Sequence, residues 1–311
     1  MSELLNELKL EEHYDDPSFC FLRVNIDDHT SFYNDLADYV FSESKLLSYV
    51  ENISSIKFNP SKEAYTKLYK ELDKFIDDEN IESLTFDKKG FAKETIETLI
   101  EEYDGGETAT DFIIRLDKIG RIGEYIFHHF LVDHFSLSCI LPKISMTTNK
   151  NMSIYGIDLL FYDEKESMIL FGESKVTVRL NNGITQVNIS LSEYEKQIRE
   201  EFKLVFGNNQ LKIKALNEIF QDAIEVSISF DEFVNNAGIT KIGIPVFITH
   251  GEDVDPDTII NDMNSKIVRK ELFGIDTKYI LISMPIIDKH EFTKHVTQHI
   301  KSKMTSYAAS R

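Results

Sequence analysis

The sequence of 311 residues contains two cysteines, Cys20 and Cys139. Two cysteines are too few for a disulfide framework or for a cysteine-rich zinc site. No stretch approaches the ~18 uncharged apolar residues of a transmembrane helix, and the first residues are acidic, unlike the basic start of a signal peptide. These absences predict a cytoplasmic protein.

Several motifs that bind nucleotides or metals are also missing. The sequence has no P-loop, no G-x-S-x-G nucleophile elbow and no Rossmann glycine fingerprint. The histidines near residue 129 lack the H-E-x-x-H order of a zinc helix, and the acidic residues 251–255 lack the glycine and final glutamate of an EF-hand loop. Any nucleotide-driven step therefore has to come from another protein.

Basic residues are scarce, with 34 lysines and arginines against 53 acidic residues and a net charge of −19. Residues 1–110 carry 26 acidic and 11 basic side chains, and the remainder carries 27 and 23. Nonspecific DNA affinity comes from lysine and arginine, so the isolated chain should bind DNA poorly. The acidic N-terminal part, residues 1–110, either docks on a basic surface of a partner, masks a functional site of the chain by mimicking the charge of DNA, or simply keeps the protein soluble.

Apolar periodicity predicts an α/β protein. Helices are expected over residues 31–50, 61–76, 88–103, 113–135, 189–206, 256–273 and 289–304, and strands over 19–26, 138–144, 153–162, 168–180, 241–250 and 278–285. The best boundary signal is the turn sequence at residues 104–106. We therefore expect an acidic, mainly helical N-terminal region at 1–105 and a second domain at 106–311.

The residues most indicative of chemistry flank an expected β-hairpin with its turn at residues 163–167. Asp158 ends the G-I-D sequence of the first arm, and Glu173 and Lys175 lie in the F-G-E-S-K sequence of the second. Alternation along a strand directs Glu173 and Lys175 to one face and Ser174 to the other. Pairing about the turn brings Asp158 near Glu173, which predicts a site for a hard divalent cation beside an ammonium group.

A further acid, Glu124, lies in a mostly apolar helix that reads as packed on the sheet. A glutamate on such a helix is costly unless it meets a cation or a donor. Gly120 and Gly123 should let this helix approach the sheet closely. Asn181, Asn182 and Gly183 are expected to end the strand that carries Glu173.

The order helix acid, strand Asp, strand Glu-x-Lys resembles the PD-(D/E)xK nuclease superfamily, which implies a restriction-endonuclease-like αβββαβ core with a mixed central sheet flanked by helices. More narrowly, the I-G-E-Y helix and the Y-G-I-D-L-L and F-G-E-S-K strands resemble the HamA family. That resemblance implies the nuclease subunit of the Hachiman anti-phage defence system, with the helicase HamB as partner and DNA as substrate.

The expected mechanism is metal-dependent hydrolysis of DNA phosphodiester bonds. Asp158 and Glu173 are expected to hold Mg²⁺ or Mn²⁺, with Glu124 binding a second metal or ordering metal-bound water. Lys175 is expected to position the attacking water. Two alternatives stay open: a non-catalytic subunit that senses or clamps DNA, and a phosphoesterase acting on nucleotides or RNA. A surface ion pair without function is the plain explanation against which these are weighed.

Overall fold

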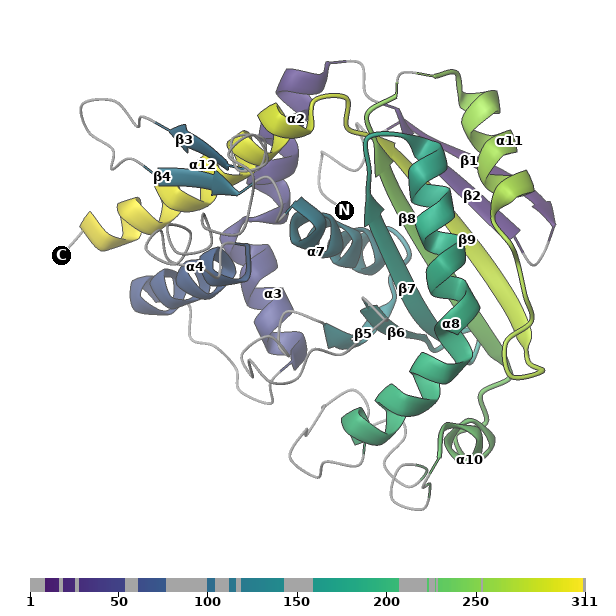
Figure 1. Cartoon of the computed structure of the whole chain (residues 1–311). Helices are drawn as coiled ribbons and strands as arrows, with labels where there is room; N and C mark the ends of the chain where they lie inside the picture. Colours follow the sequence, from purple (N-terminus) through teal and green to yellow (C-terminus); the bar gives the residue numbers. More distant parts are fainter. Residues whose placement is uncertain are drawn as a thin grey trace, which may run out of the picture.

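The central feature of the molecule is one mixed β-sheet with helices on both faces (Figure 1). In the computed structural model the described residues are 9–16, 19–25, 28–53, 61–76, 100–103, 112–115, 119–142, 159–206, 223, 227, 229–252 and 254–309. Within these ranges, no helix combines the length and the apolar character needed to cross a membrane.

The sheet has seven strands in the order β1-β2-β9-β8-β7-β6-β5. They are β1 (Lys9–Asp16), β2 (Phe19–Asn25), β5 (Ser138–Pro142), β6 (Leu159–Asp163), β7 (Met168–Val176), β8 (Lys241–His250) and β9 (Asp276–Pro285). Strands β7, β8, β9 and β2 are parallel, whereas the pairs β1–β2, β6–β7 and β5–β6 are antiparallel. The nearly unbroken apolar runs of β8 and β9 are typical of parallel strands that are buried on both faces.

Helices cover the two faces of this sheet. They are α2 (His29–Val40), α3 (Glu43–Ile53), α4 (Lys62–Ile76), α7 (Ile119–Asp133), α8 (Leu180–Phe206), α10 (Phe230–Asn236), α11 (Pro256–Lys266) and α12 (Lys289–Ala309). Figure 1 shows α8 and α11 on one side of the sheet and α7 on the other. Along the chain, α7, β5, β6, β7, α8 and β8 follow the expected α–β–β–β–α–β order, with α10 inserted before β8.

The two faces of β7 contact different helices because successive side chains of a strand point to opposite faces. Ile169 and Phe171 belong to the apolar cluster that includes α8 and α11. Met168 and Leu170 belong to a second cluster, which includes α7. Odd-numbered residues of β7 therefore face α8, and even-numbered residues face α7.

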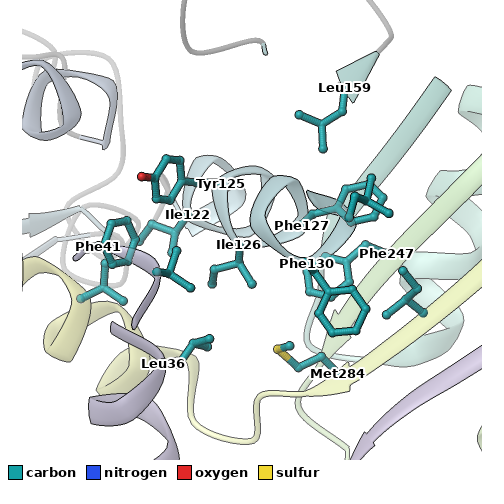
Figure 2. Packing of buried hydrophobic residues seen from close by; sticks show 14 of the residues in the cluster. Leu36, Phe41, Ile122, Tyr125, Ile126, Phe127, Phe130, Leu159, Phe247 and Met284 are labelled. Atoms are coloured by element: carbon teal, nitrogen blue, oxygen red, sulfur yellow. The ribbon is translucent and has the colours of Figure 1, made fainter. Parts of the chain in front are cut away.

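Helix α7 is packed between the sheet and the N-terminal helices (Figure 2). The ring of Phe127 stacks on Phe247 of β8 with their centroids 5.2 Å apart. The ring of Tyr125 stacks on Phe41, which directly follows α2, at 5.0 Å. Because aromatic rings bury large apolar areas, these two contacts hold α7 from two directions.

One glycine allows α7 to approach β7 closely. A Cβ atom added to Gly123 would lie 2.4 Å from Cγ2 of Val176, which is closer than two carbon atoms can approach. A Cβ atom on Gly120 would meet no atom of the described residues within 4 Å. The expectation of close approach is thus confirmed for Gly123 and wrong for Gly120, an exposed residue in the first turn of α7.

The N-terminal segment contributes to the same core as the rest of the chain. Strand β2 pairs with β9, and helices α2, α3 and α4 share an apolar cluster with α7 and α12. Glu43 of α3 accepts hydrogen bonds from Lys303 and Tyr307 of α12, at 2.9 and 2.7 Å. The boundary near residue 105 stays a prediction, but removing residues 1–105 would take away strands of the sheet and helices of its core.

Several expected helices begin or end differently in the structure. Residues 100–103, expected at the end of one helix, and residues 113–115, expected at the start of another, lie instead in the antiparallel pair β3 (Ile100–Tyr103) and β4 (Phe112–Arg115). The helix expected over residues 256–273 ends at Lys266. The strand pair forms because apolar residues in a short segment suit either a helix or a strand, and pairing with another segment decides between them.

The loop expected at residues 181–183 is instead the first turn of α8. The carboxylate of Glu252 accepts the backbone N–H of Leu180 at 2.7 Å and so satisfies a donor at the start of the helix. Glu252 is 72 residues away along the chain. This helix start therefore depends on a tertiary contact that local sequence signals do not contain.

Candidate active site

The Glu-x-Lys pair lies in the last third of β7 and is turned toward α8. The Glu173 carboxylate is 1% exposed, and the ammonium of Lys175, whose side chain is 23% exposed, forms an ion pair with its Oε1 atom. The expectation that both side chains share a face is confirmed. The buried carboxylate thus has its charge compensated by a side chain that still reaches solvent.

Ser174 points to the other face of the strand, as alternation predicts. Its Oγ atom lies 3.5 Å from the position that a Cβ atom on Gly123 of α7 would take. The side chain is buried under α7. The residue between Glu173 and Lys175 therefore belongs to the opposite face of the sheet.

A tyrosine of α8 completes the contacts of the glutamate. The hydroxyl of Tyr194, which is fully buried, donates to Oε2 of Glu173 at 2.8 Å. The sequence analysis assigned no role to Tyr194. The available signal was its spacing from Val187 and Leu191, which places all three on the sheet-facing side. The two oxygens of Glu173 thus have different partners: Oε2 accepts a hydrogen bond from α8, and Oε1 forms an ion pair with Lys175 of β7 itself.

Asp158, the second expected carboxylate on the sheet, lies outside the described residues. It directly precedes Leu159, the first residue of β6, and Leu159 pairs with Gly172, the residue before Glu173. The described part of the hairpin has the antiparallel pairing that was expected. The proximity of Asp158 and Glu173 stays a prediction.

Glu124 comes from α7 and is half-buried. Its neighbour Gly123 packs against Ser174 and Val176, the residues on the face of β7 that α7 covers. The structure therefore brings Glu173 and Lys175 together and places Glu124 on the other side of the strand that carries them. If Glu124 and Glu173 have a common role, Glu124 has to contribute to it from the opposite face of β7.

The oxygen ligand that Glu173 offers suits a hard divalent cation. Glu173 offers a carboxylate, and Mg²⁺ and Mn²⁺ prefer such oxygen ligands over the thiolates and imidazoles that bind softer metals. Among the described residues, no three histidine, cysteine, aspartate or glutamate side chains are grouped to hold a metal ion. Glu173 thus fits as one ligand of a site whose further carboxylate would be Asp158.

Two histidines of α7 are core residues with uncharged rings. His128 and His129 are 2% and 3% exposed. Burial lowers the pKa of His129 to about 3, and burial together with the neighbouring His129 lowers the pKa of His128 well below its usual value. His129 packs edge-on against Tyr125 at 4.6 Å, and His128 packs on Phe161 at 5.5 Å. Their environment is that of packed rings.

Comparison with known proteins adds one positive finding. Among curated proteins, none matches the chain. The model of one protein family, HamA, matches residues 2–300, and this range contains Glu124, Asp158, Glu173 and Lys175. Because the match covers almost the whole length, the chain belongs to the HamA family, a component of the Hachiman defence system.

Proposed function

We propose that this chain is a metal-dependent deoxyribonuclease, the effector subunit of its defence system and a member of the PD-(D/E)xK superfamily. The observation that carries the proposal is the buried Glu173, held by Lys175 and Tyr194 on a central strand. A buried ion pair is weak evidence of stability, since apolar residues of similar volume often serve equally well. Charged groups kept in such a place are candidates for chemistry.

In this proposal each acid has a separate role. Glu173 and Asp158 would hold Mg²⁺ or Mn²⁺, and Glu124, which lies on α7, would order water or a second ion. When bound, the cation would activate water and offset negative charge on the phosphate. Lys175 orients the attacking water, and Tyr194 keeps the Glu173 carboxylate in one orientation. Burial under α8 excludes bulk solvent from Glu173 and strengthens these interactions.

The proposed partners are inferred from the net charge of the chain and from its lack of a nucleotide-binding motif. A chain with a net charge of −19 has little electrostatic attraction for DNA, so another subunit should deliver the substrate. We propose the helicase HamB as that subunit, since the sequence itself lacks a nucleotide-binding motif. Its proposed contact is the acidic surface of the N-terminal segment.

The test is plasmid cleavage by the full chain together with its helicase, with and without Mg²⁺. The decisive variant is Glu173→Gln with Lys175→Met. A matched control is Glu166→Gln with Lys241→Met, which removes an exposed pair of the same residue types whose Nζ–Oε2 distance is 2.6 Å.

Cleavage should require Mg²⁺, should be lost in the first double variant and should persist in the control. Thermal unfolding and co-purification with the helicase verify that both variants fold. Undiminished cleavage by the folded Glu173/Lys175 variant would exclude the assigned site. Absence of cleavage by every form, with the complex intact, would favour a non-catalytic DNA-sensing subunit.

A further inference from the structure

The two donors that hold Glu173 differ in how easily they can leave. Tyr194 is fully buried and belongs to the apolar cluster between α8 and the sheet. Lys175 is 23% exposed at its side chain and carries its ammonium on a flexible four-carbon stem. Of the two, only the lysine can withdraw into solvent without breaking packed contacts.

The two donors also differ in charge. The phenol of Tyr194 is neutral, so Lys175 supplies the positive charge that compensates the Glu173 carboxylate. A buried carboxylate without such a partner is costly. A divalent cation bound at Glu173 would supply this charge itself and would repel an ammonium at the same oxygen.

We propose that the ammonium of Lys175 occupies the position beside Glu173 that a divalent cation would take. Its ion pair with Oε1 and the binding of a divalent cation therefore exclude each other. This inference rests on the proposed metal-dependent function and describes how the site is controlled. In the metal-free protein Lys175 neutralises Glu173 and keeps the site closed to weakly bound ions. With a divalent cation bound at Glu173, the Lys175 ammonium would leave Oε1 and be free to orient the attacking water, while Tyr194 would keep its hydrogen bond to Oε2.

The inference predicts that removing the lysine charge tightens metal binding. The experiment measures Mn²⁺ affinity of the full-length chain by calorimetry and Mn²⁺-dependent thermal stabilisation, neither of which requires cleavage. The variants are Lys175→Gln, which removes the charge, and Lys175→Arg, which keeps it. Glu173→Gln tests the site itself, and Lys241→Gln is a control at the exposed ion pair.

We expect Lys175→Gln to bind Mn²⁺ roughly tenfold or more tightly than the wild type, since it removes a like charge within a few ångströms of the ion. Lys175→Arg and Lys241→Gln should stay close to the wild type, and Glu173→Gln should lose binding. The melting temperature of Lys175→Gln should be lowered without metal and should rise further than that of the wild type when Mn²⁺ is added.

The outcomes separate the two proposals. If Glu173→Gln loses binding but Lys175→Gln binds no more tightly than the wild type, mutual exclusion is wrong and the metal site stands. If the wild type and Glu173→Gln bind Mn²⁺ equally, or neither binds, both the exclusion and the metal site at Glu173 are overturned. Tighter binding by Lys175→Arg as well would attribute the effect to side-chain shape rather than charge and would also refute the inference.

Discussion

The hydrogen bond from Tyr194 to Glu173 offers the sharpest test of the site's construction. It joins a buried phenol to a buried carboxylate at 2.8 Å, and both side chains are at most 1% exposed. A hydrogen bond to a charged group contributes about 1.5–3 kcal/mol, and one between neutral groups about 0.5–1.5 kcal/mol. Tyr194→Phe should therefore lower the free energy of unfolding by about 1.5–3 kcal/mol in the wild type.

The same substitution should cost less when the acceptor is neutral. In a Glu173→Gln background the phenol donates to an amide oxygen, so the loss should fall to about 0.5–1.5 kcal/mol. The difference is a coupling energy of about 1 kcal/mol or more, which a double-mutant cycle measures by urea denaturation of the four proteins.

A second buried tyrosine provides the control for this cycle. Tyr69 donates its hydroxyl to the backbone oxygen of Phe41 at 2.7 Å and belongs to a different apolar cluster from Tyr194. Combining Tyr69→Phe with Glu173→Gln should be additive within about 0.5 kcal/mol. Equal additivity for Tyr194→Phe and Glu173→Gln would refute the view that Tyr194 stabilises the ionised carboxylate.

Two further predictions concern α7. Gly123→Ala should destabilise the protein, because its new Cβ atom meets Val176 and such overpacking costs about 1–3 kcal/mol. Gly120→Ala should be neutral or should stabilise the protein by up to about 1 kcal/mol. Equal melting temperatures of the two variants would contradict the steric argument. Acid should weaken the fold through His128 and His129, because the pKa of each ring is lower in the folded protein than its ordinary value of 6.5. Their contribution to stability is complete above pH 6.5. For His129 it is lost as the pH falls from 6.5 toward the folded pKa of about 3. The loss is about 2 kcal/mol for His129 at pH 5, and urea unfolding at pH 7.5 and 5 should show a shallower pH dependence in a His129→Phe variant.

Much of the local organisation around the site could be predicted from the sequence. Alternation along β7 is a property of every strand, so the shared face of Glu173 and Lys175 followed from their spacing of two. The apolar runs of β8 and β9 likewise identified buried strands before any contact was known. These inferences succeeded because each depends on residues that are neighbours along the chain.

Contacts between distant segments were harder to predict. A strand was expected at residues 19–26, but no local signal indicated that β2 would pair with β9 in the central sheet. Residues 181–183 carry turn signals, yet the contact of Glu252 with Leu180 starts a helix there. In both cases the deciding partner lies far along the chain, where local preferences give no information.

The sequence by itself determined that the chain forms an α/β protein with an acidic front and that Glu173 and Lys175 point the same way. Only the tertiary structure decided that Tyr194 holds Glu173 and that Glu124 approaches from the opposite face of β7. The physical reason is the separation along the chain of the residues that set each feature. Periodicity and alternation are set within a single element, whereas the partner of a buried charge depends on which helix the folded chain lays over each face of the sheet.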